Sequence, residues 1–133
     1  MITINGKELE VDQVVAIANG ERVELDPAVI PTIQRSRDAV ETLVAEGRIA
    51  YGITTGFGRF KDKLISPSQV KELQLNLVRS HCVGVGPLLD EPTVRSMLAV
   101  RANTLAMGFS GVRPEIIELL IGLLNEGVHP EIP

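Results

Sequence analysis

The 133-residue sequence has few of the residues that mark several common classes of protein. It has one cysteine, Cys82, which excludes an internal disulfide and suits a reducing compartment. No apolar run approaches the ~18 residues that span a bilayer, and we expect no signal peptide. The formal net charge is −4, without the basic stripe of a nucleic-acid binder. These absences predict a cytoplasmic protein with neither membrane nor nucleic acid as a partner.

Aromatic residues are also scarce, at 3% of the chain, and tryptophan is missing. Hydrophobic residues nevertheless make up 44% of the sequence. A core built from Leu, Ile, Val and Ala is typical of helices packed on helices. We therefore predict a mainly α fold.

The first residues predict a small β-element. Ile2 and Ile4, then Leu9 and Val11, alternate with polar residues on either side of Asn5-Gly6, which indicates a β-hairpin. A short helix capped by Asp12 should follow and stop at Gly20. Val23 and Leu25 indicate one more short extended segment.

Helical patterning dominates the rest of the chain. Caps, prolines and glycines place four helices, running from Asp26-Pro27 to Gly47, from Ser66-Pro67 towards Gly84, from Asp90 to Gly108, and from Pro114 to Gly127. Residues 66–69, Ser-Pro-Ser-Gln, fit a capping box. Residues 48–65 interrupt this pattern with three glycines, which predicts a long loop.

Two side chains are candidates for chemistry. Tyr51 lies in the glycine-containing loop and could transfer a proton, although a lone loop tyrosine is more often a packed ring with a satisfied hydroxyl. His81 follows Leu77 by four residues, which places it on the apolar face of its helix, and we expect it to be buried and neutral. Taken alone, it too is more often a core histidine bonded to a backbone carbonyl.

Other polar residues give weaker signals. His81, Cys82 and His129 match no zinc-ligand spacing, so no metal site is predicted. Cys82 has a histidine beside it only in sequence, which does not make a catalytic dyad. Ser110 lacks the Gly-x-Ser-x-Gly pattern of a nucleophile elbow and is read as a turn residue.

Three ordered blocks carry a resemblance to a known family. Residues 51–58 (Tyr-Gly-Ile-Thr-Thr-Gly-Phe-Gly), 73–81 (Leu-Gln-Leu-Asn-Leu-Val-Arg-Ser-His) and 103–113 (Asn-Thr-Leu-Ala-Met-Gly-Phe-Ser-Gly-Val-Arg) resemble segments of the aromatic amino-acid ammonia-lyases. The histidine-specific members are the most similar. Because the blocks keep the family's order and spacing, they outweigh the commoner readings of Tyr51 and His81.

The resemblance implies a fold and a set of roles. The fold would be the helical one of ammonia-lyases and fumarases, with residues 1–133 as an N-terminal segment that precedes the central helical bundle. Tyr51 would remove the β-proton of the substrate, supported by Thr55, Gly56, Phe57 and Gly58. His81 would contact the substrate's imidazole ring. The pair Ser80-His81 favours histidine, because phenylalanine-specific relatives carry an apolar pair there and tyrosine-specific relatives carry histidine followed by leucine.

The same resemblance implies a cofactor that the chain does not encode. In the family, an Ala-Ser-Gly tripeptide cyclises to a methylidene-imidazolone electrophile. The only Ser-Gly pair here is Ser110-Gly111, and Phe109 precedes it. A base without an electrophile should give no rate enhancement, so these residues alone are predicted to be inactive.

Two alternatives to an N-terminal piece of a histidine ammonia-lyase stay open. The chain could be a natural short subunit of a split lyase, with a complementary polypeptide that supplies the electrophile. It could also be a non-catalytic binding or assembly protein that keeps the fold. In the intact enzyme we expect a small-molecule amino-acid substrate, histidine, and a homo-oligomer. We also expect the isolated chain to self-associate through exposed aliphatic helix faces.

Overall fold

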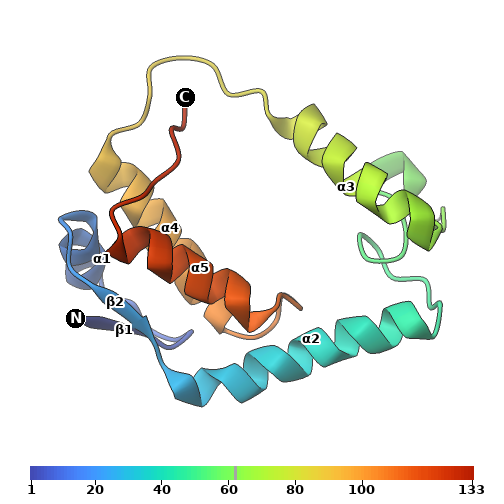
Figure 1. Cartoon of the computed structure of the whole chain (residues 1–133), viewed down its shortest axis with the longest axis horizontal. Helices are drawn as coiled ribbons and strands as arrows, with labels where there is room; N and C mark the ends of the chain where they lie inside the picture. Colours follow the sequence, from blue (N-terminus) through green and yellow to red (C-terminus); the bar gives the residue numbers. More distant parts are fainter. Residues whose placement is uncertain (62) are drawn as a thin grey trace. The chain divides into compact units, whose positions relative to one another are not determined.

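The computed structural model describes residues 1–61 and 63–133. The chain divides into two compact units (Figure 1). The first unit comprises residues 1–38 and 86–133, and the second comprises residues 39–85. Helices dominate both units, which confirms the predicted mainly α fold. Within the described residues, no helix is long and apolar enough to cross a membrane.

The first unit begins with a strand–helix–strand arrangement. Strand β1 (Ile2–Ile4) pairs in parallel with β2 (Val23–Leu25), so that Ile2 lies opposite Val23 and Ile4 opposite Leu25. Helix α1 (Val11–Ala18) connects them. The predicted β-hairpin is therefore wrong. Strands joined by a tight turn pair antiparallel, whereas a connecting helix returns the chain to pair in parallel.

The start of α1 explains why the hairpin does not form. The Gln13 side chain accepts a hydrogen bond from the Glu10 backbone N–H at 2.9 Å, which fixes the first turn at Val11. The predicted cap, Asp12, lies inside this turn. Ile17 of α1 is fully buried, and its burial favours the helical alternative.

Helix α4 (Glu91–Ala106) contributes most to the core of the first unit and contacts both α1 and α5 (Pro114–Asn125) (Figure 1). Ala99 and Ala102 of α4 are completely buried. Their small side chains allow the neighbouring helices to approach α4 closely. The remaining core side chains are aliphatic, as the composition predicts: they include Ile4, Ile17, Val23, Ile33, Leu105, Ile117, Ile121 and Leu124. The Asp90 carboxylate accepts from the Thr93 N–H at 2.9 Å, which confirms the predicted start of α4.

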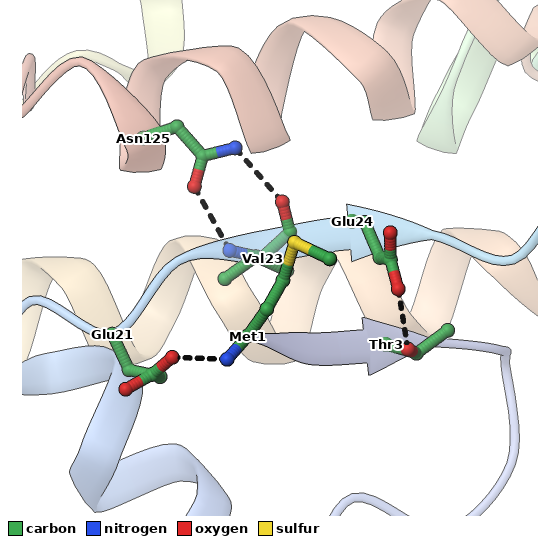
Figure 2. Close-up of polar contacts among 6 residues, drawn as sticks. All are labelled: Met1, Thr3, Glu21, Val23, Glu24 and Asn125. Atoms are coloured by element: carbon green, nitrogen blue, oxygen red, sulfur yellow. Dashed lines mark hydrogen bonds and ion pairs between the residues drawn. The ribbon is translucent and has the colours of Figure 1, made fainter.

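Two polar side chains connect segments of this unit that are distant in sequence. The buried Arg95 of α4 donates from Nε to the Ile17 carbonyl and from Nη1 to the Leu124 carbonyl, each at 3.0 Å. Asn125, at the end of α5, accepts from the Val23 N–H at 2.9 Å and donates to the Val23 carbonyl at 2.8 Å (Figure 2). These bonds fasten α5 to both α4 and β2.

Helix α2 (Ile30–Ala45) passes from the first unit into the second. It follows a short 3₁₀ helix, η1 (Pro27–Val29). Asp26 precedes η1 and caps it, because its carboxylate accepts a hydrogen bond from the Ala28 N–H at 2.9 Å. The second unit then contains the 3₁₀ helix η2 (Gly58–Phe60) and the helix α3 (Pro67–His81). Ser66 precedes α3 as predicted, but the capping box does not form, because the Ser66 hydroxyl donates to the Gln69 side-chain oxygen at 2.8 Å.

Candidate active site

The loop that carries Tyr51 is folded tightly by its own polar groups. The N–H groups of Ile53 and Thr54 donate to the Ala50 carbonyl at 3.1 and 3.0 Å, and the Thr54 hydroxyl accepts from the Ala50 N–H at 2.8 Å. An isolated antiparallel bridge between Thr55 and Leu64 closes the base of the loop. Local hydrogen bonds therefore define the conformation in which Tyr51 is presented.

Phe57 and Gly58 position Tyr51 directly. The two aromatic rings meet edge to face, with centroids 5.9 Å apart. The Tyr51 hydroxyl oxygen accepts from the Gly58 N–H at 3.4 Å, in a turn that gives Gly58 a φ of +55°. A side chain is disfavoured at that φ, so the glycine is needed for this donor to point at Tyr51.

Thr55 and Gly56 stabilise the base of the loop through hydrogen bonds. Thr55 is 1% exposed, and its hydroxyl donates to the Gly56 carbonyl at 3.1 Å. The Gly56 N–H in turn donates to the Lys63 carbonyl at 3.2 Å. The buried Thr55 hydroxyl thus has the partner that a buried polar group requires.

Tyr51 has the surroundings of a group that can exchange a proton. Its side chain is exposed, with 64% of its surface accessible, so a substrate can reach the hydroxyl. The Gly58 N–H donates to the hydroxyl oxygen and so orients the hydroxyl. The arrangement can therefore serve a proton transfer.

His81 is the last residue of α3 and is exposed, so the predicted burial is wrong. Its Nδ1 lies 2.8 Å from the Leu77 carbonyl oxygen and 3.0 Å from the Ser80 hydroxyl. The spacing of four residues does place His81 beside Leu77. However, the contact is with the carbonyl of Leu77, on a helix whose described side chains include no buried one.

The second unit holds both candidates but does not join them. No hydrogen bond or ring contact links Tyr51 to His81 among the described residues. Tyr51 precedes α3, whereas His81 ends it, after 15 helical residues.

A feature that the sequence pattern does not reveal is a largely apolar hollow of about 610 Å³ beside the tyrosine loop. Its lining includes Val44, Ile53, Leu64 and Val70, with the polar Thr54 and Ser66. These residues come from α2, the loop and α3, so no local pattern predicts that they meet.

Comparisons with known proteins identify the family. The profile of the family described as "Aromatic amino acid lyase" matches residues 9–133. A histidine ammonia-lyase from Chloroflexus aurantiacus is 48% identical over 136 residues, which cover 99% of this chain and 26% of that protein. The chain belongs to the aromatic amino acid lyase family, as the three sequence blocks predict.

Solved structures agree. Tyrosine aminomutase from Streptomyces globisporus superposes with a TM-score of 0.92 at 41% identity, covering 99% of this chain and 25% of that one. Histidine ammonia-lyase from Trypanosoma cruzi superposes with a TM-score of 0.89 at 36% identity, over 99% and 25% of the two chains. The chain spans about a quarter of the length of the relatives that it matches.

Proposed function

We propose that residues 1–133 are the N-terminal part of a histidine ammonia-lyase, which converts L-histidine to urocanate and ammonia. In this reaction a β C–H bond and the C–N bond break, a carbon–carbon double bond forms, and a base takes the β-proton. The observation that carries the proposal is the exposed Tyr51 hydroxyl, oriented by Phe57 and facing the Gly58 N–H. The similarity to histidine ammonia-lyases and the Ser80-His81 pair support histidine as the substrate.

Tyr51 is the proposed base, and His81 is the proposed contact to the substrate's imidazole. Removing a β-proton is difficult because that carbon is barely acidic, so the base must be positioned in advance. Thr55 and Gly56 fix the base of the loop, while Phe57 and Gly58 fix the ring and the hydroxyl. These four residues act on the reaction through Tyr51.

The family's methylidene-imidazolone electrophile does not fit any residues of this chain. Phe109 stands where the required alanine would precede Ser110-Gly111. The Gly111 N–H, which would have to attack a carbonyl during cyclisation, is donated to the Ser36 hydroxyl at 3.0 Å. We therefore propose that another stretch of polypeptide supplies the electrophile and that residues 1–133 alone are inactive.

We further propose that the intact lyase is a cytoplasmic homo-oligomer. The exposed Cys82 suits a reducing compartment.

Exposed apolar side chains on two helices support the homo-oligomer. Leu75 and Val78 of α3 are 49% and 59% exposed, while Met97 and Val100 of α4 are 47% and 50% exposed. Helix faces this apolar favour association, so size-exclusion chromatography with light scattering should find the isolated chain as more than a monomer. A strictly monomeric, well-folded species would contradict this proposal.

The decisive experiment joins this chain to the remaining three quarters of the Chloroflexus aurantiacus relative. Urocanate formation is followed by ultraviolet absorbance for the fusion, for residues 1–133 alone, and for the fusion with Tyr51→Phe. We expect turnover by the fusion and none by the chain alone. Tyr51→Phe keeps the ring contact with Phe57 but removes the hydroxyl, and should lower kcat by about 10²–10⁴-fold.

Three results would contradict different parts of the proposal. Conversion of tyrosine or phenylalanine, but not histidine, by the fusion would show that the substrate assignment is wrong. Full activity of the Tyr51→Phe fusion would show that Tyr51 is not the base. Turnover by residues 1–133 alone would instead refute the need for an electrophile from elsewhere.

A further inference from the structure

The contacts around His81 are compatible with one placement of its proton. Nδ1 lies 2.8 Å from the Leu77 carbonyl oxygen, and that oxygen has no hydrogen to donate. The contact is therefore attractive only when Nδ1 itself carries the proton. The Ser80 hydroxyl donates to the same carbonyl at 2.9 Å, so its lone pairs are free to accept from Nδ1, which lies 3.0 Å away.

We propose that Ser80 and the Leu77 carbonyl hold His81 as its Nδ1–H tautomer, so that Nε2 is left as a hydrogen-bond acceptor. The hydrogen bond made by one imidazole nitrogen sets the state of the other. This inference rests on the proposed function, which assigns His81 to the substrate ring. It adds Ser80 as a positioning residue, since Ser80 acts through His81.

A hydrogen-bond acceptor at Nε2 of His81 favours substrates whose ring carries a hydrogen-bond donor. The imidazole of histidine presents an N–H donor and the phenol of tyrosine presents an O–H donor, whereas the phenyl ring of phenylalanine presents neither. A substrate ring that carries a donor can replace the hydrogen bond that water makes to Nε2, whereas a ring without one cannot. The tautomer therefore favours a substrate ring with a hydrogen-bond donor over the phenyl ring of phenylalanine.

The test is a long-range ¹H–¹⁵N correlation spectrum of residues 1–133 with labelled histidine, recorded where both imidazoles are neutral. The chain has only two histidines, His81 and His129, so a His129→Gln variant assigns both sets of signals. We expect Nδ1 of His81 to be protonated and Nε2 to be bare. A proton found mainly on Nε2 in the unaltered chain overturns the proposal.

Serine variants test the part played by the hydroxyl. Ser80→Ala removes one of two acceptors for Nδ1–H and should move the tautomer ratio about five-fold towards Nε2–H, with Ser80→Thr restoring it. Ser96→Ala is the matched control, because the Ser96 hydroxyl donates to the Pro92 carbonyl at 2.8 Å in α4, in the other unit of the chain. An unchanged ratio in Ser80→Ala overturns the role of Ser80.

The spectra involve neither substrate nor turnover. A wrong tautomer would therefore leave the lyase proposal intact, and a fusion that forms no urocanate would leave the tautomer intact. The two proposals fail separately.

Discussion

Replacing Arg95 with methionine is expected to lower the free energy of unfolding of the first unit substantially. Arg95 is 5% exposed, and its guanidinium donates to the carbonyls of Ile17 and Leu124, near the ends of α1 and α5. Carbonyls in the last turn of a helix lack helical N–H partners, and the helix dipole makes them favourable sites for a positive charge. One side chain of α4 thus connects to the ends of two other helices.

The size of the effect follows from the partners that each carbonyl keeps. Hydrogen bonds from a charged group contribute about 1.5–3 kcal/mol each, so two bonds give about 3–6 kcal/mol. Both carbonyls also accept from a following glycine, Gly20 at 3.1 Å and Gly127 at 3.4 Å, and neither loses its last partner. Methionine also avoids the cost of burying a charge. We therefore expect a net loss of about 2–4 kcal/mol, a large fraction of a typical stability.

Urea unfolding followed by circular dichroism measures this loss. Arg95→Lys should fall between the unaltered chain and Arg95→Met, because an ammonium lacks the fork that reaches two carbonyls. Ser96→Ala, at the partly buried neighbouring position, removes one hydrogen bond to a carbonyl of its own helix and should cost no more than about 1 kcal/mol. If Arg95→Met unfolds at the same urea concentration and with the same slope as that chain, the two hydrogen bonds contribute nothing net and the reasoning is refuted.

Three further predictions concern other parts of the first unit. Gly6→Ala should destabilise by more than about 3 kcal/mol in thermal unfolding, because a Cβ there lies 2.6 Å from the Ala106 backbone at a φ of +71°. Gly20→Ala, with φ +100° but nothing within 4 Å, tests the strain alone and should cost less; equal losses would contradict the clash. Asn125→Ala should cost about 1–3 kcal/mol by chemical unfolding, because the Val23 N–H and carbonyl lose their partner, and an unchanged midpoint would count against this. Hydrogen bonds from the Thr93 side chain, and to a lesser extent from its backbone, lower the pKa of the Asp90 carboxyl. The stabilisation by this cap is therefore complete above the ordinary pKa of an aspartate and is lost as the pH falls through the lowered pKa of Asp90. Asp90→Asn should therefore reduce the loss of stability between about pH 5 and pH 2, and identical pH profiles would refute the link.

The helix ends could be predicted because their signals are local. Asp90 and Pro114 each lie next to the turn that they start, and the structure confirms those starts. Asp26-Pro27 instead start the 3₁₀ helix η1, and α2 begins only at Ile30. The β-pairing could not be predicted in this way. Ile2 pairs with Val23, and the choice between that partner and a nearby hairpin depends on burial of α1 against α4.

The site was predictable in its members but not in its geometry. The family blocks single out Tyr51 and His81, but the spacing of Leu77 and His81 shows only that they share a helix face. It does not show whether that face is covered, and His81 is exposed. Arg95 had no sequence signal at all, because its two partners lie 78 and 29 residues away.

The Asn125 side chain has a consequence for how this chain meets other chains. A strand at the margin of a sheet offers unpaired N–H and carbonyl groups, to which a strand from another molecule can add. The backbone groups of Val23 point away from β1 and are taken by the Asn125 amide, as a neighbouring strand would take them (Figure 2). Helix α5 thereby blocks the addition of another strand at Val23, which protects this edge of β2 from edge-to-edge aggregation.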